Sequence, residues 1–278
     1  MAAGLSHGPS TTVSTTVSTT LYTLLLMAPG KPDDWIQSEL DLFRIKIGPQ
    51  NKQGFFGSAN LPASVTPSLA GFMKTENRER GVDSETRKLL HYLDLVLDPQ
   101  VGQESVVDNF AAKLLEKLGY DHGDRIIFTR RALPIIVSGV LYTTQASVCV
   151  MDENNQILLI LQGELMPGLK DPEPQIVAKA IAAYHANNKV RTSQNLPPHH
   201  AITFPAISMI GTKLVFYKIS ITTYLCDAVS RGCSPGNDTH LLRYIPVLPR
   251  RHDSGMRPLE NRVEILACLE AFKQFVRN

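Results

Sequence analysis

The sequence has almost no net charge, few cysteines and no apolar run long enough to cross a bilayer. It contains 28 Lys and Arg residues and 26 Asp and Glu residues, and the net charge of +2 gives no general attraction to nucleic acid or to an anionic membrane. Any basic surface must therefore be local. Four widely separated cysteines in 278 residues favour reduced core thiols over a disulfide framework or a zinc site. This cysteine usage is typical of a cytoplasmic or nuclear protein.

The N-terminal region lacks the features of a targeting segment. The apolar run at residues 21–28 is too short to span a bilayer, and the Ser/Thr tract before it lacks the Lys or Arg that open a secretory signal. We therefore expect neither secretion nor a membrane partner. The repeat STTVSTTVSTT predicts a flexible tail over residues 1–30.

Residues 31–100 are expected to form an N-terminal segment that packs on a main domain at residues 101–278. Within this segment ELDLFRIKI, residues 39–47, alternates in the manner of a strand. SETRKLLHYLDLVL, residues 84–97, has helical spacing, with Ser84 as the expected N-cap.

The main domain has a clear order of predicted elements. An amphipathic helix closed by Gly119 comes first, and one strand follows it. Two strands joined by the turn DENN come next, and a second helix follows them. A hairpin that turns at Gly211-Thr212 and a last helix complete the domain. The helices are expected at residues 104–118, 172–188 and 261–276, and the first three strands at 124–130, 146–152 and 156–164. Helix, three strands, helix, hairpin and helix predict an α/β sandwich.

Polar residues interrupt the apolar strands at one end of the central hairpin. A turn with two central residues places Ser147 opposite Gln162 and Gln145 opposite Glu164, whereas a slip of one residue pairs Ser147 with Gly163. Such residues mark either the solvated end of a buried strand or a site. Asp152 and Glu153 lie at the opposite end of the hairpin, so we interpret both as turn residues.

The two flanking helices add further candidates. Glu104 shares the core-facing side of its helix, where it either meets a partner or stays solvated in the first turn. Gln175 and Lys179 are four residues apart and share a face, from which Lys179 could reach a strand-end carboxylate or a phosphate, although a surface lysine is the commoner case. The adjacent His199 and His200 point apart and do not predict a shared metal.

Several stretches of the main domain carry a resemblance to a known superfamily. The helix ending in LEKLGY, the hairpin VCVMDENNQILLILQ and the helix PEPQIVAKAIAAY resemble the core of the PD-(D/E)XK nucleases, over residues 104–217. More narrowly, LQGELMPGLKDPEPQIVAKAIAAYHANN, FPAISMIGTKLVFYKI and RPLENRVEILACLEAFKQFV are similar to an uncharacterised family of fungal proteins of this type. The resemblance implies a restriction-endonuclease-like α/β sandwich with a mixed central sheet.

In such nucleases a hairpin Asp and the acid of (D/E)-x-Lys bind Mg²⁺, and the lysine orients or activates the attacking water. This sequence departs from the pattern, because Ser147, Gly163 and Leu165 stand where the two acids and the lysine are expected. A neutral hydroxyl cannot replace a carboxylate as a Mg²⁺ ligand. A shifted register instead offers Gln162 and Glu164.

Three hypotheses about function follow. The first is a nuclease-like domain that has lost metal-dependent cleavage and binds a nucleic acid or a partner. The second is an active Mg²⁺-dependent nuclease with a migrated site, in which Glu104 and Glu164 bind the metal and the catalytic set is Glu104, Gln162, Glu164 and Lys179. The third is a cleft recruited to a small molecule, with substrate-binding residues Gln145, Ser147 and Gln175.

Overall fold

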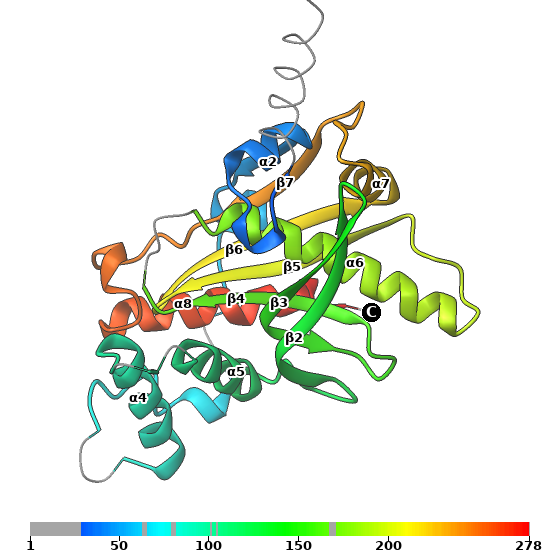
Figure 1. Ribbon diagram of the computed structural model, residues 1–278. Coiled ribbons are helices and arrows are strands. Elements are labelled where there is room, and N and C mark those ends of the chain that lie inside the picture. Colours follow the sequence, from blue (N-terminus) through cyan, green and yellow to red (C-terminus); the bar gives the residue numbers. More distant parts are fainter. Residues whose placement is uncertain are drawn as a thin grey trace, which may run out of the picture.

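A mixed sheet lies between two layers of helices in the computed structural model, which describes residues 29–62, 66–78, 82–100, 102–103, 105–166 and 171–277 (Figure 1). This architecture confirms the predicted α/β sandwich with a mixed central sheet. Most of the predicted tail, residues 1–28, and the candidate Glu104 lie outside the described residues.

The seven strands of the sheet run in the order β1-β7-β6-β5-β4-β3-β2. The pairs β1 with β7 and β4 with β5 are parallel, and the other four neighbouring pairs are antiparallel. The strands are β1 (Ile45–Pro49), β2 (Ile126–Val137), β3 (Val140–Met151), β4 (Ile157–Glu164), β5 (Ala201–Ile210), β6 (Lys213–Thr222) and β7 (Thr239–Tyr244).

The helices divide between the two faces of the sheet according to the side chains that they bury. Helices α3 (Lys52–Phe56), α4 (Ser84–Leu97), α5 (Val106–Leu118) and α8 (Leu259–Phe272) pack on one face. Helices α2 (Gln37–Leu42), α6 (Glu173–Ser193) and α7 (Thr223–Arg231) pack on the other. Short 3-10 turns are η1 (Pro32–Asp34), η2 (Pro67–Leu69), η3 (His252–Ser254) and η4 (Lys273–Phe275).

The N-terminal segment and the main domain share a hydrophobic core. Phe55 from the N-terminal segment stacks on Tyr244 of β7 and on Phe272 of α8, with ring centroids 5.6 Å and 6.2 Å apart. Phe72 makes an edge contact with Phe110 of α5 at 6.5 Å. Strand β1 of the N-terminal segment also joins the sheet as an edge strand by pairing with β7.

The predicted central hairpin is confirmed, and the alignment of Ser147 with Gln162 is the first of the two that the sequence allows. The turn is longer than the expected two residues, and a bulge at Val150 and Met151 compensates for the difference. Val148 pairs with Leu161, so Ser147 lies beside Gln162 and not beside Gly163. Asp152 is a turn residue, as predicted, because its carboxylate accepts the backbone N–H groups of the following turn. The second hairpin turns at the predicted residues.

Two local predictions for the N-terminal segment are wrong. The residues before Phe43 in the stretch read as a strand belong to α2, where the Glu39 carboxylate accepts the Ile36 N–H at 2.8 Å and so caps the helix. Only the part from Ile45 is a strand. The N-cap of α4 is Asp83, which accepts the Thr86 N–H at 2.9 Å, and not Ser84.

The structure also contains elements that the sequence analysis did not predict. Strands β2 and β3 extend to a two-residue turn at Ser138 and Gly139, whose φ angles of 50° and 76° suit the twist of a hairpin. Helix α7 and strand β7 lie between the second hairpin and the last helix. Strand β7 is structurally important, because it joins β1 to the rest of the sheet.

Candidate functional site

Helix α6 connects β4 to β5 and packs across the sheet (Figure 1). It thereby lies over the polar C-terminal end of β4 and the middle of β3. Strands β4 and β5 are parallel neighbours, and a connection between such strands normally needs a covering helix. The residues of α6 are buried almost all round over its first three turns. A charged side chain on that stretch must therefore find partners inside the protein.

Lys179 is that charged side chain. Its residue is 3% exposed, its ammonium donates a hydrogen bond to Oε1 of Gln162, and it lies 3.5 Å from Oδ1 of Asp33. Burial lowers the pKa of Lys179, while the negative charges of Asp33, Glu164 and Asp108 act in the opposite direction. The commoner interpretation of Lys179 as a surface lysine is therefore wrong. Its ammonium contacts the Gln162 amide and the Asp33 carboxylate, so its predicted contact with a strand-end carboxylate or a phosphate stays a prediction.

Gln162 and Glu164 point to the same face of the sheet, because side chains alternate along a strand. Glu164 is half-buried, and burial raises its pKa, although Lys179 and a hydrogen bond with Gln162 lower it in part. Gly163 faces α5 instead, where a Cβ atom would lie 2.6 Å from Oδ1 of Asp108. The fold thus brings Gln162, Glu164 and Lys179 together.

Asp108 is a member of the cluster that the sequence analysis missed. It lies in the first turn of α5, its side chain is 14% exposed, and its carboxylate lies 3.8 Å from Nε of Arg130 and close enough to Ser147 for that residue to lower its pKa in part. Burial raises the pKa of Asp108 above its usual range. The available signal was its spacing of four residues from Glu104, which places both on one helical face.

The other predicted site residues take different positions. Ser147 is 9% exposed and lies near enough to Asp108 to lower the pKa of that carboxyl, so we count it as part of the cluster. Gln145 is exposed, and Gln175 is half-buried one turn before Lys179 on α6. The assignment of Gln145 and Gln175 as substrate-binding residues therefore stays a prediction, because no hydrogen bond within the part of the chain that the structure describes joins either of them to the cluster.

The cluster does not form a metal centre from the residues described. Among those residues, no group of three or more His, Cys, Asp or Glu is arranged to hold a metal ion. Glu104, the predicted third ligand, lies outside them. A Mg²⁺ site therefore stays a prediction. In the same part of the chain, no helix is long and apolar enough to cross a membrane.

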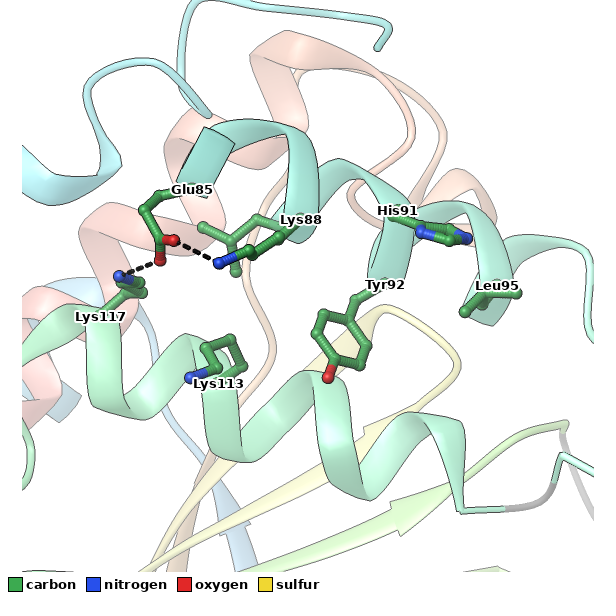
Figure 2. Close-up of a pocket in the computed structure, with 8 residues that line it drawn as sticks. Glu85, Lys88, His91, Tyr92, Leu95, Lys113 and Lys117 are labelled. Carbon is green, nitrogen blue, oxygen red and sulfur yellow. Dashed lines mark hydrogen bonds and ion pairs between the residues drawn. The ribbon is translucent and has the colours of Figure 1, made fainter. Parts of the chain in front are cut away.

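A separate pocket of about 490 Å³ lies between α4 and α5 on the opposite face of the sheet. Figure 2 shows the carboxylate of Glu85 between two lysines, with distances of 2.8 Å to Lys88 and 2.7 Å to Lys117. Lys113 pairs with Glu116 of its own helix at 2.7 Å. Because its charges are exposed and pair with one another, we place the candidate site at Lys179 and not in this pocket.

Replacing Asp108 with asparagine is expected to stabilise the protein at neutral pH by about 1 kcal/mol, since it removes a partly buried carboxylate and keeps an oxygen for Ser147. Because folding raises the pKa of Asp108, its favourable contribution is present below the unfolded pKa of about 4 and is lost as the pH rises through the folded pKa. The stability gain of Asp108→Asn should therefore grow from acid to neutral pH. Urea unfolding of both proteins across this range measures it, and a variant less stable than wild type at pH 7 would contradict it.

Comparison with known proteins finds no matching family model and no similar curated protein. The proposal of a function therefore depends on the geometry of the cluster of Asp33, Asp108, Ser147, Gln162, Glu164 and Lys179, which we call the Lys179 cluster.

Proposed function

We propose that the chain is a nuclease-like domain that binds the sugar-phosphate backbone of a nucleic acid at the Lys179 cluster and does not cleave it. The observation that carries the proposal is the position of the Lys179 ammonium, which α6 places beside Gln162 near the C-terminal end of β4. Lysine is a common ligand of phosphate groups in proteins.

The arrangement around this lysine supports the resemblance to PD-(D/E)XK nucleases. The chain order is α5, three antiparallel strands, α6 and then β5, which is parallel to β4. Within it, Ser147 and Gln162 are neighbours, as a hairpin acid and the first residue of (D/E/Q)-x-Lys would be. The lysine comes from the helix and not from the strand.

The proposed lack of cleavage is explained by the two residues, Ser147 and Gln162, that stand where metal-binding acids would be expected. Ser147 offers only a neutral hydroxyl, and Gln162 offers an amide oxygen that already accepts a hydrogen bond from Lys179. A Mg²⁺ ion takes oxygen ligands, among which carboxylates supply the compensating charge. The two carboxylates Asp108 and Glu164 remain, and burial disfavours the ionised form of each.

Arg130 supplies a second cation for a phosphate at the rim of the cluster. Its side chain is 56% exposed and lies 3.8 Å from Asp108, on the strand next to Ser147. A backbone carries a phosphate at each nucleotide, so one group can reach Arg130 while its neighbour approaches Lys179.

The test is an incubation of the purified protein with labelled single-stranded and duplex DNA and RNA, in Mg²⁺, in Mn²⁺ and in EDTA. We expect binding in all three conditions, weaker with rising salt, and no cleavage. Fluorescence anisotropy measures binding, and denaturing gels measure cleavage.

Metal-dependent cleavage that Glu164→Gln abolishes would contradict this proposal and would favour the active nuclease. A specific observation favours that second candidate, namely the two carboxylates Asp108 and Glu164 near Lys179. No binding of any nucleic acid, together with a small molecule that copurifies and is lost in Lys179→Met, would favour the recruited cleft.

A further inference from the structure

The carboxylate of Asp33 lies where two buried donors meet. Oδ1 of Asp33 accepts a hydrogen bond from Oγ1 of Thr144 at 2.6 Å and lies 3.5 Å from Nζ of Lys179. Thr144 and Lys179 are 1% and 3% exposed, whereas the Asp33 side chain is 54% exposed. An exposed anion therefore covers a buried hydroxyl and a buried ammonium.

The backbone around Asp33 is fixed in place. Pro32, which precedes Asp33 in the chain, is buried. Trp35, two residues after Asp33, is also fully buried. Its ring stacks on Phe43, with centroids 5.4 Å apart, and its Nε1–H donates to the carbonyl of Gly30. Turn η1 also packs against α6 and β3. With the backbone fixed, the half-exposed Asp33 side chain is the part of this segment that can rotate toward solvent and leave the Lys179 ammonium.

A carboxylate oxygen and a phosphate oxygen accept the same hydrogen bonds from an ammonium and a hydroxyl. We propose that Thr144 and Lys179 form a subsite for one phosphate oxygen, which Asp33 occupies in the free protein and which a phosphate ligand must take over. This inference rests on the proposed function and adds to it an internal competitor that weakens binding.

The experiment compares Asp33→Asn and Asp33→Ala with Asp41→Asn. Asp41 is a suitable control, because it is an exposed carboxylate of the neighbouring α2 whose partner is Gln37. At low salt the Asp33 variants are expected to bind a labelled single-stranded oligonucleotide about tenfold more tightly than wild type, equivalent to about 1.4 kcal/mol. Asp41→Asn should change the affinity less than about twofold, since surface charges away from the contact are screened.

A second arm uses inorganic phosphate as the probe and the melting temperature as the readout. Millimolar phosphate is expected to raise the melting temperature of Asp33→Ala more than that of wild type or Asp41→Asn. The double variant Asp33→Ala with Lys179→Met should lose both gains.

The outcomes separate the two proposals. If nucleic-acid binding depends on Lys179 but neither Asp33 variant binds more tightly than wild type, Asp33 is not a competitor of the phosphate. The proposed function would then stand without it. Phosphate stabilisation of Asp33→Ala without nucleic-acid binding by any variant would support the subsite and overturn the proposed function. If neither nucleic acid nor phosphate discriminates Asp33→Ala from Asp41→Asn, the subsite itself is wrong.

Discussion

Lys179→Met is expected to lower the affinity for single-stranded nucleic acid at least about tenfold and to change the free energy of unfolding by less than about 1 kcal/mol. Methionine fills the space of the lysine stem, so packing on the buried face of α6 is kept. The ammonium is lost, and Asp33 and Glu164 then repel a phosphate without a nearby cation. Anisotropy titrations and urea unfolding measure the two quantities.

The matched control for this variant is Lys189→Met. Lys189 is an exposed residue of the same helix, so its replacement removes the same charge from α6. We expect less than about a threefold loss of affinity, because a distant exposed charge is largely screened. Equal losses in the two variants would show that only the net charge matters and would remove Lys179 from the proposed site.

Arg262→Met is expected to destabilise the protein by about 3–5 kcal/mol, because it leaves three carbonyl oxygens without their donor. The Arg262 residue is 1% exposed, and its guanidinium donates to the carbonyls of Met256, Phe72 and Thr75 at 3.2, 2.9 and 2.7 Å. It also lies 4.6 Å from the ring centroid of Phe72, and burial lowers its pKa to about 10. This side chain thus connects α8 to the N-terminal segment.

Urea unfolding of Arg262→Met measures this effect, with Arg257→Met as the control. Arg257 precedes α8 and is exposed, so its replacement should change stability by less than about 0.5 kcal/mol. If the N-terminal segment and the main domain unfold together, both variants should show one transition. An Arg262→Met protein as stable as wild type would contradict the role of this side chain in joining them.

The parts of the fold that the sequence predicts well are set by short-range patterns. The DENN turn marks the position of the central hairpin, although a bulge at Val150 and Met151 shifts its register by one residue. Gly119, with a φ of 77°, ends α5 where the sequence places that end. Gly211 similarly marks the second hairpin. In each case, residues within a few positions of one another decide the structure.

The errors arise where one pattern fits two structures. Alternation in ELDLFRIKI suits a strand, but Glu39 can also cap a helix by binding the Ile36 N–H, and this local bond is formed. Asp83 and Ser84 are both good N-caps, and the structure uses the aspartate.

The site depends on contacts between residues far apart in the chain, and the sequence predicts it only in part. Lys179, Gln162 and Ser147 are predicted because their strands and helix are neighbours along the chain. Asp33 reaches Thr144 across 111 positions, so no local spacing could have revealed it. Asp108 is four residues after Glu104, so helical periodicity alone could have predicted its position on the same helical face.

The central claim is that the ammonium of Lys179 binds a phosphate without a metal ion. Its most direct test is the salt dependence of oligonucleotide affinity in EDTA, for wild type and for Lys179→Met. The slope of log affinity against log salt measures the number of phosphates that the protein neutralises. We expect binding in EDTA and a slope that is smaller by about one in Lys179→Met. Equal slopes for the two proteins, or binding by wild type only when Mg²⁺ is present, would contradict the claim.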